Sequence, residues 1–578
     1  MLVLLTSFIL PLLSVVTMTW SYYVGGTLLV GSGLLVAYTL VSRSATLLDI
    51  EVDFALALVW IEVFTLLTVI AAGGVVSILL GRSSALLALV SGDKVVVTDP
   101  WNGMLTVDLE VFFLARPLLT AASIGLVVAA FLTLFRESFQ PIVTLLSRRL
   151  ARGDRSTYER ARQLSSSHRV DSRFSTILLP YIVLLASIAL GIAVGLYPYT
   201  VAGFSGVLGY DSWFYLQNLA SMSKLEDAIR LLPSGRALFL ILLFFIRNAT
   251  GLSVEWVVRL MPALLSCLLA ISAFALVKEG TGRLWIAALA AVLSVLSPQA
   301  ALGTSVGIIN NWFALSIANF AFALILRWIR LRSKLAAVGS FALLLILLGS
   351  YAFFWVVVIV ELAAILLASI IGLRTVGGQE WKREVGIFGS LLLGSMTLSA
   401  VISLMLSLLG LGLTGLDPAY WMAQGWSYVQ TVDPNLLGSL SRQFEEAFFF
   451  ASNQIDLPFL MLLSILGLID SRSQTCFFGR MVSASILVPA MLMLIISSST
   501  SSPYTSFMIT WRGIYLMPLY VTGALGVWSV IRRMSGDKSP WRSGTQFALC
   551  GAFAAYVIVS SLSFSLRARE LVIMLAEG

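Results

Sequence analysis

Uninterrupted apolar runs, each long enough to cross a lipid bilayer, recur through most of this 578-residue sequence. A membrane-spanning helix needs about 20 such residues, because each residue advances the helix by about 1.5 Å. Charged residues make up 11% of the chain, whereas soluble proteins carry about 25%. A soluble enzyme, a disordered scaffold, a coiled coil and a disulfide-rich secreted domain are therefore excluded. The runs are continuous rather than alternating, which also argues against a membrane β-barrel.

We predict an all-α, polytopic helical membrane protein with about 15 transmembrane helices. Four predicted spans form an N-terminal region, residues 1–135, and eleven follow a basic segment, residues 136–174. The spans are expected at residues 3–20, 23–42, 54–80, 112–135, 175–198, 256–277, 284–298, 312–329, 335–350, 353–372, 386–413, 456–469, 481–498, 511–531 and 546–565. The shorter apolar stretch 237–246 is expected to form a juxtamembrane or re-entrant helix.

The distribution of basic residues predicts the orientation of the chain. The net charge is +8, and in a membrane protein such an excess reports cytoplasmic loops rather than nucleic-acid binding. Residues 136–174 are rich in arginine, which places them in the cytoplasm. Threading the spans from there puts every strongly basic loop on the same side. The external face then carries four segments, 199–255, 299–311, 414–455 and 499–510, which contain few lysines and arginines.

The residue types that are scarce here limit the chemistry of any site. His168 is the only histidine, so a multi-histidine metal site is impossible within this chain and a Ser-His triad is disfavoured. The three cysteines, Cys267, Cys476 and Cys550, lie far apart and predict neither a disulfide framework nor a zinc knuckle. Acid–base or metal chemistry is therefore expected from Asp, Glu, Lys and Arg.

Two of the external segments carry polar residues beside aromatic ones. Asp211 and Trp213 lie in the stretch 209–217 (GYDSWFYLQ), where a carboxylate could hold a divalent cation or simply be solvated in an interfacial aromatic belt. Asn310 and Asn311 lie in the stretch 303–312 (GTSVGIINNW). These amides could bind a polar ligand or cap the N-terminus of a helix.

Two further candidates lie later in the chain. Arg512 is at the external entrance of a predicted span, where a guanidinium could bind phosphate in a forked geometry or snorkel to lipid headgroups. Asp433, within Thr431-Val432-Asp433-Pro434, is a candidate carboxylate for activating an acceptor, and its alternative is an ordinary solvated loop.

The order of these features resembles the membrane domain of the oligosaccharyltransferase catalytic subunit, in its archaeal or eukaryotic form, a GT-C transferase. That family has an Asp followed by aromatic residues in its first external loop, as at 211–214. In its second external loop, the family has a Gly followed by an Asp-Asn-Glu stretch. Residues 307–312 are similar to this stretch. The family then has a Tyr/Trp-rich span, to which residues 349–355 are similar. An acidic motif follows, similar to residues 431–434, and then an Arg before a Pro, similar to residues 512–518. The resemblance covers about 175–565, a GT-C-like domain preceded by four extra spans.

The sequence departs from the family pattern in two respects. Asn310 stands where the family has Asp, and Trp312 stands where it has Glu. The tail, residues 566–578, is too short for the family's external domain with its Trp-Trp-Asp-Tyr-Gly motif. We therefore expect a degenerate relative that lacks this domain, whose fold carries over more securely than its activity.

The resemblance implies a donor sugar carried on a polyprenyl phosphate or pyrophosphate. It implies a divalent cation, Mg or Mn, at Asp211, with Asp211 and Asp433 as catalytic residues and Arg512, Asn310, Asn311 and Trp213 as substrate-binding residues. Because the second motif is neutral, metal affinity is expected to be low. The resemblance also implies an archaeal-type plasma membrane with the active face external. The implied partners are the lipid bilayer, the polyprenyl-linked donor and a protein acceptor or partner subunits, with no nucleic acid. The alternatives are a non-catalytic homologue that binds a lipid-linked glycan or serves as a subunit of a membrane complex, and a transporter.

Overall fold

The computed structural model describes most of the chain between residues 173 and 408 and separate segments on either side of it. The described residues are 94–99, 103–108, 125–135, 173–200, 203–224, 227, 236–297, 299–300, 303–304, 307–375, 379–408, 456–470, 476–497 and 515–534. The predicted spans 3–20, 23–42, 54–80 and 546–565 lie outside these residues, as do Asp433 and Arg512. The structure consequently does not test the expected total of 15 spans.

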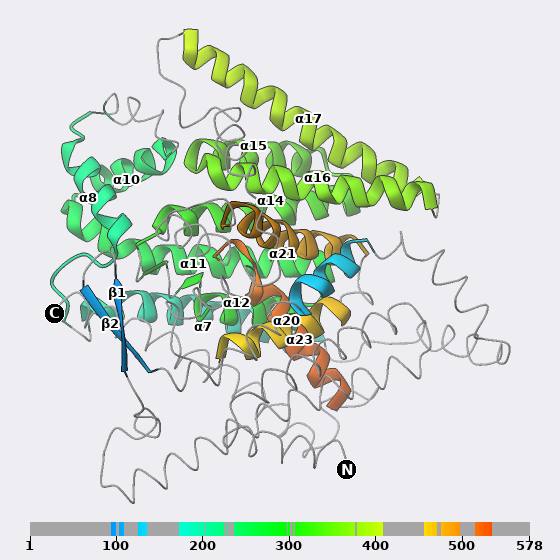
Figure 1. Ribbon diagram of the computed structural model, residues 1–578, viewed down its shortest axis with the longest axis horizontal. Coiled ribbons are helices and arrows are strands. Elements are labelled where there is room, and N and C mark those ends of the chain that lie inside the picture. The colour runs from blue at the N-terminus through cyan, green and yellow to red at the C-terminus, as the bar shows by residue number, and fades with distance from the viewer. Residues whose placement is uncertain are drawn as a thin grey trace, which may run out of the picture.

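Long helices dominate the described residues and lie side by side, as Figure 1 shows. Their backbone polar groups are satisfied within each helix, which is what a hydrocarbon environment requires. In chain order they are α7 (Arg173–Thr200), α8 (Tyr210–Ser221), α10 (Ala237–Thr250), α11 (Val254–Thr281), α12 (Leu284–Val295), α14 (Ile309–Leu331), α15 (Lys334–Ser350), α16 (Ala352–Thr375), α17 (Gln379–Leu408), α20 (Asp456–Asp470), α21 (Cys476–Ser497) and α23 (Leu519–Met534).

Within the described residues, five helices are long and apolar enough to cross a membrane. They are Leu178–Thr200, Val254–Thr281, Ile309–Leu331, Ala352–Arg374 and Lys382–Ile402. Each coincides with a predicted span, and shorter apolar helices occupy other predicted spans. The prediction of a helical protein embedded in a membrane is therefore confirmed. The stretch 237–246 is also helical, as part of the 14-residue α10.

Two elements differ from the prediction. Strands β1 (Lys94–Asp99) and β2 (Gly103–Asp108) pair antiparallel, with Lys94 opposite Asp108, and form a hairpin that we did not predict. In the span expected at 511–531, the described residues 515–516 and α23 are helical, and the helix is interrupted at Met517 and Pro518, directly before Leu519. A proline lacks the backbone N–H and is therefore favoured at the start of a helix.

The centre of the bundle is formed by α11, α12 and α14, whose facing residues are largely buried. A hydrogen-bonded contact crosses this core. Asn319 of α14 donates to the Tyr520 hydroxyl of α23 at 2.7 Å and to the Ser272 hydroxyl of α11 at 3.3 Å. Buried amides and hydroxyls need such partners because they have lost their contact with water. This contact joins three helices that are far apart in the sequence.

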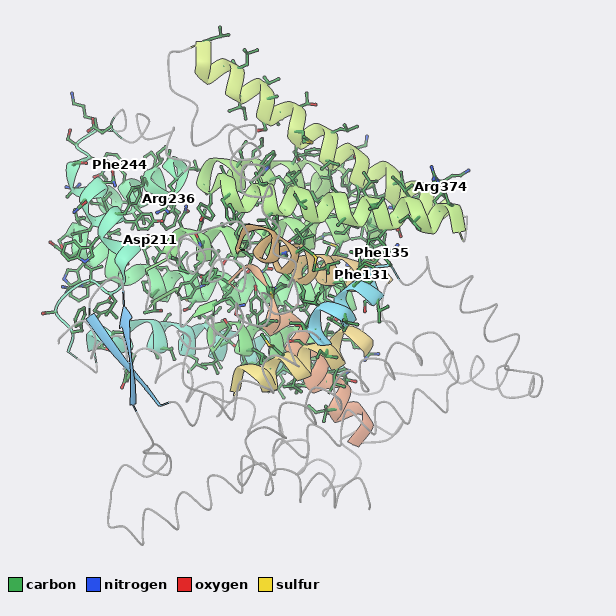
Figure 2. All side chains as sticks on the ribbon, in the orientation of Figure 1. Phe131, Phe135, Asp211, Arg236, Phe244 and Arg374 are labelled. Carbon is green, nitrogen blue, oxygen red and sulfur yellow. The ribbon has the colours of Figure 1, made fainter. Side chains whose placement is uncertain are left out.

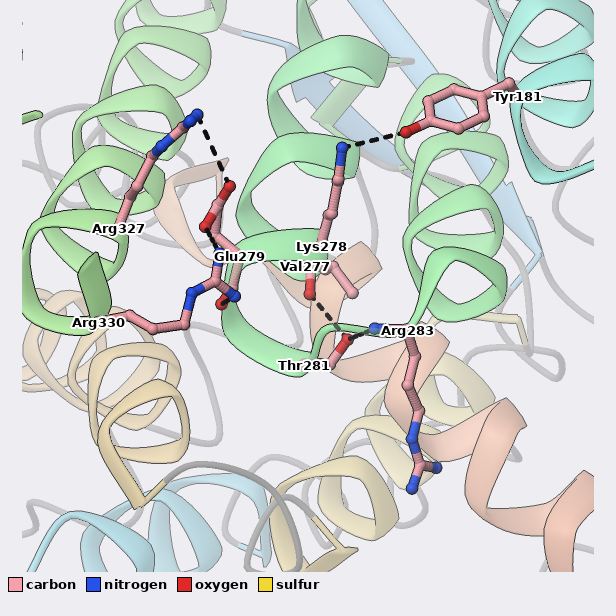
Figure 3. Close-up of polar contacts among 8 residues, drawn as sticks. All are labelled: Tyr181, Val277, Lys278, Glu279, Thr281, Arg283, Arg327 and Arg330. Carbon is pink, nitrogen blue, oxygen red and sulfur yellow. Dashed lines mark hydrogen bonds and ion pairs between the residues drawn. The ribbon is translucent and has the colours of Figure 1, made fainter. Parts of the chain in front are cut away.

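Charged groups gather at one end of the bundle, which we call the basic end and define by Lys278, Glu279, Arg283 and Arg330. Figure 3 shows Arg327 and Arg330 of α14 on either side of Glu279 of α11, with ion-pair distances of 4.0 and 2.5 Å. Lys278 donates to the Tyr181 hydroxyl at 3.0 Å. These basic residues come from several of the loops that were predicted to share one side of the membrane.

Candidate functional site

The opposite end of the bundle carries the short helix α8, whose first turn contains Asp211. Gly209 precedes this helix with a φ of 86°, a left-handed conformation that favours glycine. The turn is closed by the Ser212 amide, which donates to the Gly209 carbonyl at 3.1 Å. A carboxylate in the first turn is stabilised by the positive end of the helix dipole. Asp211 is thereby held near the surface of the bundle with a side chain that is 13% exposed.

The loop before α14 packs directly onto this turn. Gly307 adopts a φ of 75°, and a Cβ atom at this position would lie 2.7 Å from the Ser212 backbone nitrogen. The side chain of Ser212 is buried at the same contact. Only a glycine allows such a close approach of two backbones. The two stretches that the sequence singled out, 209–217 and 303–312, therefore meet in space.

A third segment supplies Arg236, the residue before α10. Its Nη1 lies 3.5 Å from Asp211 Oδ2 and donates to the Tyr215 hydroxyl at 3.5 Å. The guanidinium carbon lies 5.0 Å from the ring centre of Phe214, 5.9 Å from that of Tyr215 and 6.0 Å from that of Tyr351. Figure 2 shows Asp211 and Arg236 together at one end of the molecule, with Arg374 at the other. An ion pair enclosed by aromatic rings is weakly screened by solvent.

The junction between α15 and α16 forms the fourth side of the site. Asn310 Nδ2 donates to the Ser350 carbonyl at 2.7 Å, which ties the start of α14 to Tyr351, the residue that faces Arg236. Four side-chain atoms here are buried and have no hydrogen-bond partner among the residues that the structure describes: Asn310 Oδ1, Asn311 Nδ2, Ser350 Oγ and the Tyr351 hydroxyl. Buried polar atoms without partners are uncommon in native structures. Their concentration here indicates a site that is built to receive a polar ligand.

Tyr215 lies beneath the ion pair and is fully buried. Burial raises the pKa of its phenol, so the hydroxyl remains protonated and neutral at physiological pH. Its ring packs edge-on against Phe239 of α10, with ring centres 5.5 Å apart. Tyr215 therefore forms a rigid floor for Arg236 and adds no charge of its own.

The structure brings some of the expected site residues together and leaves others apart. Asp211 and Asn310 lie at one site, with Asn311 beside them. Trp213 is 54% exposed on the surface of α8, which suits contact with lipid better than contact with the ion pair. Asp433 and Arg512 are outside the described residues, so their expected roles stay predictions.

Arg236 is the residue of this candidate site that the sequence did not single out. It is a basic residue on a face that is otherwise poor in lysine and arginine, directly before an apolar helix. That same observation singled out Arg512. The signal was therefore present in the sequence, but no pattern indicated that Arg236 would meet Asp211.

A divalent cation, which the resemblance implies at Asp211, is poorly matched by the residues observed there. Hard cations prefer several carboxylate oxygens, but Asp211 is the only carboxylate in this described cluster, and Arg236 contacts it. Asn310 and Asn311 are neutral amides, and the described residues contain no group of three or more His, Cys, Asp or Glu arranged to hold a metal. These residues suit an anionic or neutral polar ligand better than a metal ion.

The chain has little detectable similarity to known proteins. No protein-family model and no curated protein matches its sequence. Among solved structures it is similar to the crystal structure of the Archaeoglobus fulgidus oligosaccharyltransferase in the apo form, at 12% sequence identity and a TM-score of 0.43. The match covers 69% of this chain and 57% of that chain, little more than half of its length. A likeness at this TM-score carries no argument about activity.

Proposed function

We propose that this protein is a membrane glycosyltransferase of the GT-C type, similar to the oligosaccharyltransferase catalytic subunit. In this proposal it takes a sugar from a polyprenyl-phosphate-linked donor at the external face of the membrane and transfers it to a protein or lipid acceptor. The observation that carries the proposal is the meeting of Asp211, Arg236 and Asn310 at one end of a membrane-embedded helical bundle.

The reaction requires two kinds of group at such a site. As the bond between sugar and phosphate breaks, negative charge grows on the leaving phosphate, and a fixed cation stabilises it. A carboxylate positions or activates the acceptor nucleophile. Arg236 and Asp211 are groups of these two kinds, held near each other on separate segments of the chain. Arg512 and Asp433 remain candidates for the same two roles.

The position of the site relative to the membrane also supports a lipid-linked donor. The site lies at the end of the apolar helices α14, α15 and α16, so a polyprenyl tail could remain in the hydrocarbon while its phosphate reaches Arg236. A water-soluble donor would have no need of this location. The nearby exposed aromatic residues, Trp213 and Phe245, suit the boundary between lipid and water.

A transfer assay tests the proposal. Purified protein in lipid nanodiscs is supplied with a polyprenyl-phosphate-linked sugar and an acceptor peptide or lipid, and sugar transfer is followed by mass spectrometry. We expect transfer by the native protein and a loss of about a hundredfold or more in Asp211→Asn. Glu255→Gln is the matched control, because Glu255 is an exposed carboxylate at the first turn of α11. Equal transfer by Asp211→Asn and the native protein would remove Asp211 from the mechanism.

A second candidate function is that of a non-catalytic homologue that binds a lipid-linked glycan or a partner subunit. The observation that favours it is the neutral pair Asn310 and Asn311, together with the engagement of Asp211 by Arg236. This alternative predicts saturable donor binding with no sugar transfer to any acceptor. Measurable turnover that depends on Asp211 would exclude it.

A further inference from the structure

The positive charge at this site comes from the protein itself. Arg236 Nη1 lies 3.5 Å from Asp211 Oδ2, and the two side chains are 18% and 13% exposed. A carboxylate in such surroundings requires a compensating charge, and the guanidinium supplies it. A divalent cation at Asp211 would therefore lie close to a permanent positive charge, and repulsion between the two would lower its affinity.

The neutral groups nearby are mostly hydrogen-bond donors. Of the four buried atoms that have no partner in the described part of the chain, the Asn311 amide nitrogen and the Ser350 and Tyr351 hydroxyls all carry hydrogens that can be donated. Asn310 Oδ1 is the single pure acceptor among the four. A phosphate presents several acceptor oxygens for these hydrogens, whereas a hard divalent cation prefers carboxylate oxygens, which these neutral groups do not supply. The set of donors therefore complements an anion.

The aromatic rings fix the guanidinium in place. Arg236 lies within 6.0 Å of the ring centres of Phe214, Tyr215 and Tyr351. Contacts with ring faces hold a guanidinium while leaving its edge able to donate hydrogen bonds. Asp211 and Tyr215 both contact the same nitrogen, Nη1. Arginine carries five N–H donors in a planar fork, so one side chain can bind a carboxylate and a phosphate together.

We propose that Arg236 is the resident cation of this site and, with the Tyr351 and Ser350 hydroxyls, binds the phosphate of a prenyl phosphate without a divalent metal ion. This inference rests on the proposed function, because it assigns the phosphate of the lipid-linked donor to the same site. It goes beyond that function in naming a group that the sequence motifs do not mark and in making the site independent of Mg²⁺ and Mn²⁺.

The test is a binding titration of farnesyl phosphate, with farnesol as the probe that lacks phosphate. Purified protein is titrated in the presence of EDTA and again with added Mn²⁺. We expect equal affinity under both conditions and no detectable affinity for farnesol. Arg236→Gln should weaken binding about tenfold or more, and Arg236→Lys should weaken it less, because a charge-assisted hydrogen bond is lost only in the first. Arg330→Gln is the matched control, an ion-paired arginine at the basic end.

The possible outcomes separate this inference from the proposed function. Binding that EDTA abolishes and Mn²⁺ restores would overturn the resident-cation role and leave the proposed function standing. A folded Arg236→Gln protein that binds farnesyl phosphate as tightly as the native protein would also overturn the resident-cation role and leave the proposed function standing. Failure of the native protein to bind a prenyl phosphate under either condition would overturn both.

Gel filtration and thermal unfolding show whether Arg236→Gln folds. If it does not fold, a second measurement tests whether the site of the native protein binds a divalent metal ion. Mn²⁺ is titrated into the native protein and followed by electron paramagnetic resonance. We expect no stoichiometric Mn²⁺ site at the end of the bundle that carries Asp211. One bound Mn²⁺ per chain that disappears in Asp211→Asn would overturn the inference.

Discussion

Asn310 has a structural reason to be an amide rather than a carboxylate. Its Nδ2 donates to the Ser350 carbonyl at 2.7 Å, in a position where the side chain is 1% exposed. A carboxylate in the same place would present an oxygen to an oxygen, with no hydrogen between them. An amide at position 310 is therefore a requirement of the contact between α14 and the α15–α16 junction.

This requirement predicts that Asn310→Asp destabilises the protein. The substitution removes a buried hydrogen bond and places a charge against a carbonyl, which should cost about 1–3 kcal/mol or more. Thermal unfolding in detergent, followed by circular dichroism, measures the change. Asn248→Asp is the control, since Asn248 is exposed at the end of α10. An unchanged unfolding temperature for Asn310→Asp would show that the amide is not required as a donor.

At the scale of elements, the loop before α14 and the start of α8 depend on one glycine. Gly307 has a φ of 75°, and a Cβ atom there would collide with the Ser212 backbone. We predict that Gly307→Ala costs about 1–3 kcal/mol and separates Asp211 from Asn310, because strain and the collision act together. The unfolding temperature and prenyl-phosphate binding should both fall.

Gly386→Ala is the matched control for this prediction. Gly386 lies on α17 with no heavy atom within 4 Å of a Cβ atom at that position, and it is exposed. Alanine is the better helix former, so this variant should be as stable as the native protein or slightly more stable. If Gly307→Ala behaved like Gly386→Ala, the two loops could not be in the contact that the structure shows.

A buried ion pair joins α17 to α21 near the basic end. Arg480 Nη2 lies 2.9 and 3.1 Å from the two carboxylate oxygens of Glu384, and their side chains are 2% and 10% exposed. Arg480→Met leaves a buried carboxylate without its counter-charge, which should cost about 3–5 kcal/mol. Replacing both residues with Met should cost far less, because no buried charge remains.

A double-mutant cycle on unfolding free energies measures this coupling. The control pair is Glu279 with Arg330, whose side chain is 47% exposed, so Arg330→Gln should cost only about 0–1 kcal/mol. A double variant as unstable as the sum of the two single variants would show that Glu384 and Arg480 do not interact.

The helices and strands differ in how well the sequence could predict them. The hydropathy of the apolar runs located α7, α11, α14, α15 and α16 closely, because burial in lipid and helix formation both follow from local composition. The hairpin of β1 and β2 was missed, although the valine run and the Asn102-Gly103 dipeptide in the sequence are signals of a strand pair. The contact of Arg236 with Asp211 could not be predicted, because nothing local to either residue specifies a partner in another segment.

At the scale of the whole molecule, the separation of charges between the two ends is the main consequence of the fold. Arg327, Arg330, Lys278 and Arg283 gather at the basic end, around the ends of α11 and α14 (Figure 3). Asp211 and Arg236 lie together at the other end (Figure 2). From the positive-inside rule we predict that the basic end faces the cytoplasm. The side of the membrane that the Asp211 site faces is therefore determined by residues at the opposite end of the bundle.

The orientation predicts the result of cysteine labelling in membrane vesicles of known sidedness. Glu255→Cys lies beside α8 at the end that carries the site, and Arg332→Cys lies between α14 and α15 at the other end; both residues are exposed. A membrane-impermeant maleimide should label Glu255→Cys only from the external side and Arg332→Cys only from the cytoplasmic side. The unsubstituted protein is the control, since it measures labelling of Cys267, Cys476 and Cys550. Labelling with the reverse sidedness would place the site in the cytoplasm, where a donor on the external leaflet could not reach Arg236.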